Sequence, residues 1–146
     1  ALFTQHVLGM QPCPWCIAQR ILYLLCGALA ILAALPPVRS SAGRIIATLF
    51  SAAGIVAAGG ALVTALYQHF VAAASGSCAI TAADRFLTET GLAEWLPEVF
   101  ESRASCAEAD QALIGLPYSI WSAILAVILL MLGGLALRAL WRSRVR

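Results

Sequence analysis

The chain has 146 residues, of which 62% are apolar and only 11% are charged. Soluble domains average about 45–50% apolar and about 25% charged residues, so this composition excludes a soluble globular enzyme, a disordered chain and a nucleic-acid-binding protein. The formal net charge is only +2, and the distribution of the charges is more informative than their sum.

Three long stretches with almost no charge predict transmembrane helices, over residues 15–35, 45–70 and 118–137. At about 1.5 Å per residue, their apolar runs reach roughly 28–35 Å, enough to cross a hydrocarbon core of about 30 Å. Buried helices of a soluble protein are the alternative, but little of the chain remains to cover them. The sequence therefore predicts an all-α protein embedded in a membrane.

The arginines indicate how the chain crosses the membrane. Six of the nine lie in the short loop 36–44 and in the tail 138–146, whereas the long loop 71–117 holds two arginines and all seven acidic residues. Because positive loops stay in the cytoplasm, we expect loop 36–44 and the tail on that side. Segment 1–14 and loop 71–117 are then expected outside the membrane.

An outer segment 1–14 needs a preceding helix to carry it across the membrane. The apolar start of the chain is too short to span. We therefore interpret residues 1–14 as the end of a first helix that is largely missing from this sequence, followed by the first outer segment. The intact protein would then be an antiparallel four-helix bundle.

Cys13 and Cys16 form a C-x-x-C pair at the outer entrance of the first span. At a helix start the second sulfur is expected to face backbone N–H groups, which favour its thiolate. A metal site would need further ligands at suitable spacing, and only His6 is near in sequence. We therefore expect redox chemistry at this pair and no metal site.

Cys78 and Cys106 lie 28 residues apart in the outer loop, where an oxidising compartment favours a disulfide. A purely structural disulfide is the alternative, but the loop is too small and polar to hold a core of its own. Two cysteine pairs in one small outer region suggest a relay, since thiol–disulfide exchange passes oxidation from pair to pair. Cys26 lies about 15 Å deeper than Cys16 on the same helix, and we expect it to be inert.

Arg20 is one helical turn from Cys16, and a charge inside a membrane span is a functional candidate. It can stabilise a thiolate or an anionic ligand, or it can extend to the lipid headgroups. His69, at the outer end of the second span, is a weaker candidate. In the outer loop the spacing of five apolar residues predicts a short helix lying on the membrane surface: Leu92, Trp95, Leu96, Val99 and Phe100.

These residues together resemble a known family, the DsbB disulfide bond formation proteins of the bacterial inner membrane. The resemblance runs along nearly the whole chain through the following motifs: Gln5-His6-Val7, Pro12-Cys13-Pro14-Trp15-Cys16, Arg20, Tyr67-Gln68-His69, Cys78, Glu94-Trp95-Leu96-Pro97-Glu98-Val99-Phe100, Cys106-Ala107-Glu108 and Gly115-Leu116-Pro117. Gln19 departs from the pattern, because the family often carries an acidic residue before the arginine.

The resemblance implies an oxidoreductase that reoxidises a periplasmic DsbA-like protein and passes two electrons to membrane quinone, either ubiquinone or menaquinone. Cys78 and Cys106 would form the disulfide that meets DsbA, and Cys106 would then attack Cys13. Cys16 would face the quinone with Arg20 nearby, and His69 would help to bind the quinone ring. The redox sites would lie on the periplasmic side of a multi-pass inner-membrane protein.

Three alternatives remain at this point. A related oxidase serving a dedicated thiol substrate would carry the same residues. A membrane cytochrome would use His6 and His69 as haem ligands, which leaves four cysteines unexplained. A scaffold without catalytic activity would hold its cysteines as structural disulfides only.

Overall fold

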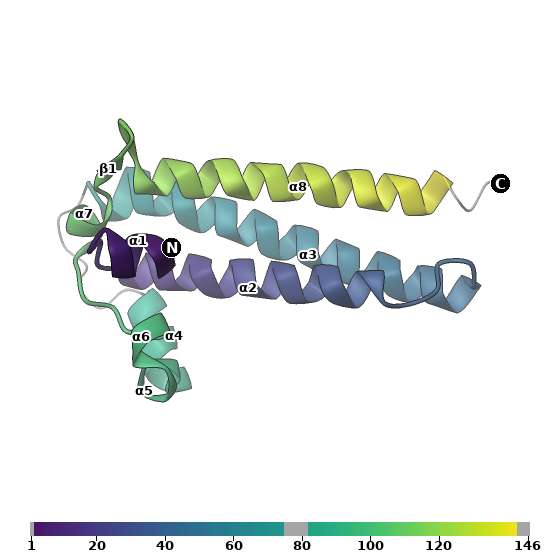
Figure 1. The fold of residues 1–146 in the computed structure, drawn as a ribbon, viewed down its shortest axis with the longest axis horizontal. Helices are drawn as coiled ribbons and strands as arrows, with labels where there is room; N and C mark the ends of the chain where they lie inside the picture. The colour runs from purple at the N-terminus through teal and green to yellow at the C-terminus, as the bar shows by residue number, and fades with distance from the viewer. Residues whose placement is uncertain (1, 75–81, 143–146) are drawn as a thin grey trace.

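The computed structural model describes residues 2–74 and 82–142 of the chain. Its frame consists of three long helices that lie side by side (Figure 1). They are α2 (Pro14–Ala34), α3 (Ser41–Tyr67), which continues as the π-helical turn η1 (Gln68–Ala72), and α8 (Tyr118–Arg142). α3 packs against both α2 and α8. All three are long and apolar enough to cross a membrane, which confirms the predicted all-α class with packed membrane helices.

The ends of α2 and α3 follow from local sequence. Cys13 is the N-cap of α2 and Pro14 occupies its first turn, where the missing N–H of proline costs nothing. Ser40 caps α3, because its hydroxyl oxygen accepts a hydrogen bond from the amide of Gly43 at 3.0 Å. A Cβ on Gly43 would collide with the carbonyl oxygen of Pro37, so this tight connection requires glycine.

The buried faces of the long helices carry mostly small residues. α3 buries Ala57, Ala58, Ala61 and Ala65, and α8 buries Ala126. Small residues allow helix backbones to approach closely, which is how membrane helices gain packing energy. Large side chains such as Ile31, Val56 and Leu132 point outward and are exposed, as expected of a surface that faces lipid.

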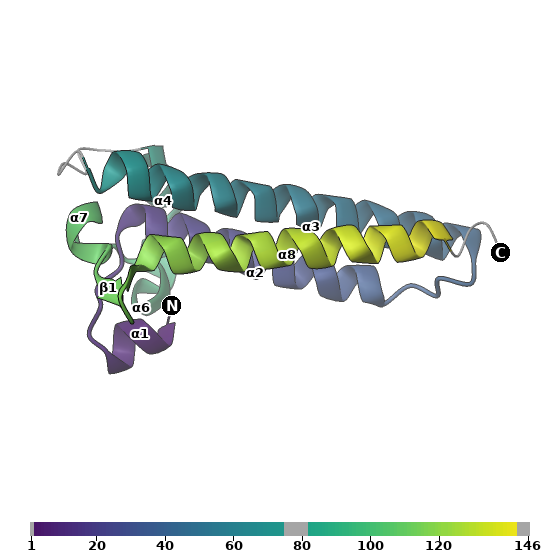
Figure 2. The same ribbon diagram turned by 90° about the horizontal axis from the view of Figure 1, so that it is seen from above.

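The short elements gather at one end of the frame, and the loop between α2 and α3 lies at the other, together with the last turns of α8 (Figures 1 and 2). The short elements are α1 (Leu2–Val7), α4 (Ala82–Thr90), α5 (Leu92–Trp95), α6 (Pro97–Phe100), α7 (Cys106–Ala109) and the hairpin of β1 (Ala112–Leu113) and β2 (Leu116–Pro117). We call the end of the frame that holds these short elements the site end, and the opposite end the far end. Toward the far end, an apolar groove of about 630 Å³ runs between α2, α3 and α8.

The observed elements differ from the sequence expectation in detail. α3 begins at Ser41 and α8 continues to Arg142, beyond the expected spans 45–70 and 118–137. The apolar stripe of the loop is divided between α5 and α6, because the backbone at Leu96 is not helical and Pro97 begins a new turn. Phe100 from this stripe is buried with Ile17 and Leu87, whereas Trp95 is exposed.

Candidate functional site

The C-x-x-C pair lies at the site end, where α2 begins. The two sulfur atoms are 2.9 Å apart, and both residues are present as thiols. Cys13 is fully buried, and its sulfur accepts a hydrogen bond from the amide of Cys16 at 3.3 Å. The helix start therefore contacts the first sulfur, whereas we had expected the second to face the amides.

The Cys13 thiol is held in its neutral form. Its hydrogen bond to the Cys16 sulfur, together with burial, raises the pKa of Cys13 well above its usual range. Cys13 therefore acts as the donor in this contact, and the Cys16 sulfur accepts. A dithiol of this kind places any negative charge on Cys16.

The Cys16 sulfur contacts a second helix through Gln68, at the junction of α3 and η1. The amide nitrogen of Gln68 donates to the sulfur at 3.3 Å. The amide oxygen of Gln68 accepts a hydrogen bond from Gln19 at 2.7 Å. Gln19 in turn accepts from the hydroxyl of Ser122 on α8. Polar side chains from all three long helices thus meet beside Cys16.

Arg20 is buried and turned toward the periphery of the site. One guanidinium nitrogen donates to the carbonyl oxygen of Val99, and another donates to Gln5 at 3.0 Å. The amide of Gln5 then donates to the carbonyl oxygen of Glu98 at 3.0 Å. Because Arg20 is only 7% exposed, the alternative of an arginine extended to the headgroups is wrong.

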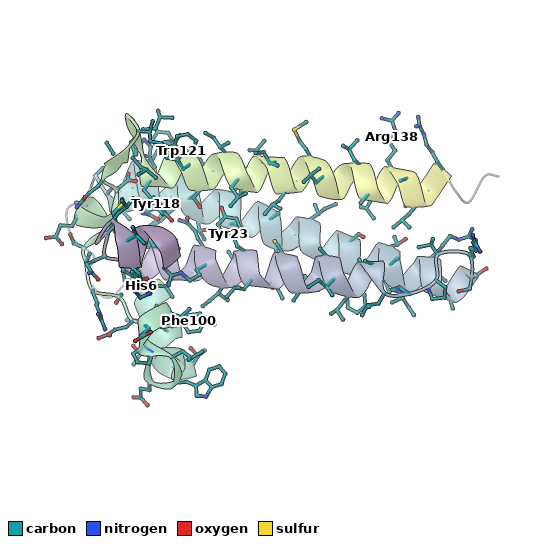
Figure 3. All side chains as sticks on the ribbon, viewed as in Figure 1. His6, Tyr23, Phe100, Tyr118, Trp121 and Arg138 are labelled. Atoms are coloured by element: carbon teal, nitrogen blue, oxygen red, sulfur yellow. The ribbon has the colours of Figure 1, made fainter. Side chains whose placement is uncertain are left out.

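A cavity opens next to these groups. The residues that line it include Cys16, Arg20, Met10 and Tyr118. Tyr23 and Tyr118 lie at this end of the helices (Figure 3). Within residues 2–74 and 82–142, the buried Nε of Arg20 has no hydrogen-bond partner, and such unpaired donors are rare in folded proteins. Cys16 and Arg20 thus line the same cavity, whose volume is about 50 Å³.

The segment before Cys106 lies directly on the C-x-x-C loop. The amides of Arg103 and Ala104 both donate to the carbonyl oxygen of Pro12, at 3.0 and 3.3 Å. Cys106 is buried at the start of α7, in one cluster with Cys13. The fold thus brings together two cysteines that are 93 positions apart in the sequence. Cys78 lies outside the described residues, so its pairing with Cys106 stays a prediction.

His69 lies in a polar group of its own. Its Nδ1 is 3.2 Å from a carboxylate oxygen of Asp110 and 3.0 Å from the hydroxyl of Ser119. His69 is not among the described residues that line the cavity beside Cys16. Its expected contact with a quinone ring therefore stays a prediction, without a direct contribution to this cavity.

Two further candidates, Cys26 and His6, are not among the described residues that line this cavity. Cys26 is buried against Ala57 and Ala58, and its thiol faces the carbonyl oxygen of Gly54 at 3.6 Å. His6 is exposed on α1 (Figure 3). Within residues 2–74 and 82–142, no three side chains of the metal-binding types come together.

Sequence reasoning missed Gln5, Gln68 and Ser122 as site residues. Gln68 carried a signal, because a neutral amide inside an apolar span must find a hydrogen-bond partner. Its partners come from positions 49 and 52 residues away. No local pattern in the sequence identifies contacts across such separations.

Comparisons with known proteins show which family the chain belongs to. The model of the family described as disulfide bond formation protein DsbB matches residues 1–136. Proteins named disulfide bond formation protein B are similar to this chain. The one from Ralstonia nicotianae is 35% identical over 130 positions, covering 88% of this chain and 77% of its own. The one from Nitrosomonas europaea is 34% identical over 148 positions, covering 99% and 84%.

A protein of the same name from Psychrobacter cryohalolentis is 35% identical over 144 positions, which cover 96% of this chain and 78% of its own. No solved structure gives a significant match to the chain. The family match and the three relatives together cover nearly every residue described above, including the C-x-x-C pair and the segment of Cys106. The chain belongs to the DsbB family of bacterial disulfide bond formation proteins, and is thereby a disulfide-generating oxidoreductase.

Proposed function

We propose that this protein reoxidises a DsbA-like periplasmic dithiol protein and passes the two electrons to membrane quinone. The observation that carries the proposal is the burial of Cys13 and Cys106 in one cluster, beside a cavity that Cys16 and Arg20 line. This arrangement supports both halves of the reaction, because one cysteine of the pair faces the loop and the other faces a ligand cavity.

The first half consists of thiol–disulfide exchanges. A thiolate of the reduced partner attacks Cys78 in a Cys78–Cys106 disulfide, so that a mixed disulfide forms and the Cys106 thiolate leaves. Cys106 then attacks Cys13 in the Cys13–Cys16 disulfide, and Cys16 leaves as a thiolate. The second thiol of the partner attacks the mixed disulfide, which releases the oxidised partner and the Cys78 thiolate.

The second half restores the starting disulfides. Cys78 attacks Cys106 in the Cys13–Cys106 bond, which reforms the loop disulfide and releases Cys13. The dithiol of Cys13 and Cys16 now holds two electrons and two protons. Cys13 and Cys16 then close their disulfide, and a quinone held beside Cys16 and Arg20 would accept the two electrons and two protons. The relay thus has a net transfer of two electrons and two protons from the partner to quinone.

The residues of the cavity fit a quinone in their chemistry. The unpaired Nε of Arg20 is a buried donor suited to a carbonyl oxygen, and the Cys16 sulfur lines the same space. Arg20 would hold the oxygen and favour the negative charge that develops on it.

Two cysteine variants test the proposal. With Cys106→Ser, Cys78 is left as a free thiol, so oxidation of the reduced partner is expected to stop. A mixed disulfide with Cys78 is then expected on non-reducing gels only when the DsbA-like partner is supplied in its oxidised form. With Cys13→Ser, quinone reduction driven by the reduced partner is expected to stop. If neither variant slows oxidation of the partner, the cysteines are structural and the proposal is wrong. Exchange with one dedicated thiol protein, and none with a general DsbA, would instead support the related oxidase.

A further inference from the structure

The side chain of Gln68 is fully buried and touches the Cys16 sulfur. It stands where the α-helical winding of α3 changes to the π-helical turn η1. Such turns insert an extra residue and re-aim side chains, often at functional sites. The result is that a neutral amide reaches across the bundle to a cysteine on another helix.

The orientation of this amide is fixed by a directed chain of hydrogen bonds. The hydroxyl of Tyr23 lies 2.7 Å from both the carbonyl oxygen and the hydroxyl of Ser122. The Ser122 hydroxyl donates to the amide oxygen of Gln19. The amide nitrogen of Gln19 therefore points at Gln68 and donates to its oxygen at 2.7 Å.

This chain directs the amide nitrogen of Gln68 toward the Cys16 sulfur. The oxygen of Gln68 accepts from Gln19 at 2.7 Å and lies 3.7 Å from that sulfur, whereas the nitrogen lies closer to the sulfur, at 3.3 Å, and donates to it. Gln19, Gln68 and Ser122 are all nearly or fully buried, where a misdirected donor would be costly. A flipped Gln68 amide would place its oxygen against the thiolate and its N–H₂ group against another N–H₂ group.

We propose that Gln68 is a catalytic residue that donates its amide N–H to the Cys16 thiolate when Cys13 is attacked, and that Gln19 and Ser122 are positioning residues for this donor. The inference rests on the proposed function, since it assigns Cys16 as the leaving sulfur. Exchange is faster when the leaving thiolate is better stabilised, and a hydrogen bond to a charged group is stronger than one between neutral groups.

The other ionisable groups around Cys16 are the same in every protein compared below. Cys13 stands at the N-cap and is replaced by Ser in all of them. Arg20 and Tyr23 come from α2, Tyr118 comes from α8, and Asp110 follows α7. A difference between the variants in the behaviour of Cys16 therefore reports on the amide chain.

The test measures the pH profile of alkylation at Cys16 by iodoacetamide, in the full chain with a Cys13→Ser background. Labelling is quantified on the Cys16 peptide by mass spectrometry. The midpoint of the profile is used, because a change in access alters the maximum rate but not the midpoint. For Gln68→Leu we expect the midpoint to rise by about one pH unit, so that labelling at neutral pH falls about tenfold.

Gln19→Leu and Ser122→Ala leave Gln68 in place but release its amide. We expect each to raise the midpoint by less than Gln68→Leu, and both remain informative if Gln68→Leu fails to fold. Thr64→Val is the matched control on the same helix, because the Thr64 hydroxyl bonds only to carbonyl oxygens of its own helix. Its midpoint is expected to stay unchanged.

An unchanged midpoint in Gln68→Leu, or in both Gln19→Leu and Ser122→Ala where Gln68→Leu does not fold, would overturn the inference. The readout uses neither quinone nor a protein partner, so it is independent of the proposed function. Failure of the unaltered chain to oxidise a reduced DsbA-like protein would reject the proposed function. Even then, the alkylation midpoints would decide by themselves whether Gln68 donates to Cys16.

Discussion

The side chain of Arg20 both anchors the outer segment and lines the cavity beside Cys16. Two of its nitrogens are used to hold the carbonyl oxygen of Val99 and the side chain of Gln5, while Nε has no partner. A guanidinium is planar and presents five donors in a fixed fork, whereas a lysine ammonium is a compact point charge. The residue therefore links the outer segment around α6 to the cavity beside Cys16.

Replacing Arg20 by Lys keeps the positive charge but removes the planar set of N–H donors. We expect the apparent KM for quinone to rise about tenfold or more, because the free N–H donor and one of the two anchoring bonds are lost. Steady-state quinone titrations on both proteins measure this. The exchange at Cys78 and Cys106 is expected to continue.

Gln5→Leu serves as the control for anchoring alone. It removes a partner of Arg20 and the bond from Gln5 to Glu98, but keeps the guanidinium. If Gln5→Leu raises the KM as much as Arg20→Lys, Arg20 acts only through the outer segment. Superimposable titrations for all three proteins would mean that other groups hold the quinone.

Cys26 is expected to take no part in the redox reaction. Its side chain packs with Ala57 and Ala58 and lines the far groove, about three helical turns from Cys16. For Cys26→Ala we expect turnover within about twofold of the unaltered protein, since only a small apolar side chain is shortened. A loss above tenfold at normal expression would contradict the relay as proposed.

Among the elements, the contact of α3 with α8 depends on one glycine more than on its neighbour. A Cβ on Gly133 would come within 2.7 Å of Cγ1 of Ile55, whereas a Cβ on Gly134 would meet nothing within 4 Å. Both glycines lie in the same apolar helix. Packing between α3 and α8 is therefore set at Gly133, while Gly134 faces outward.

The two alanine variants form a matched pair. For Gly133→Ala we expect a loss of about 1–3 kcal/mol in the free energy of unfolding, because the added methyl group displaces Ile55. For Gly134→Ala we expect no loss, or a gain of up to about 1 kcal/mol from helix propensity. Denaturation in detergent, followed by helical circular dichroism, measures both. Equal values for the pair would show that the two helices part easily at this level.

At the scale of the whole molecule, hydropathy predicts the three long helices because each is apolar over a membrane's thickness. The C-x-x-C pair and Arg20 are likewise visible in the sequence, since cysteine spacing and a charge in a span are local signals. The amide chain of Gln19, Gln68 and Ser122 is not visible, because it depends on how three helices are rotated against one another. The same reason separates His69, which faces Asp110, from the cavity it was expected to line.

The charge distribution predicts which end of the bundle faces the periplasm. Reporter insertions near Ser40 and after Arg146 are expected to behave as cytoplasmic, and an insertion near Thr90 as periplasmic. An alkaline phosphatase reporter, which is active only outside the cytoplasm, checks each position. Activity at Ser40 together with inactivity at Thr90 would reverse the orientation and place the dithiol in a reducing compartment.

The two hydrogen bonds that the Pro12 carbonyl oxygen accepts from the amides of Arg103 and Ala104 use main-chain atoms only. These main-chain hydrogen bonds do not depend on which side chain occupies the exposed position 103, so almost any amino acid is expected to be tolerated there. Proline is the exception, because it has no N–H to give. A saturation library at position 103 should therefore show broad tolerance with a single gap, unlike Arg20, where side-chain atoms make the join.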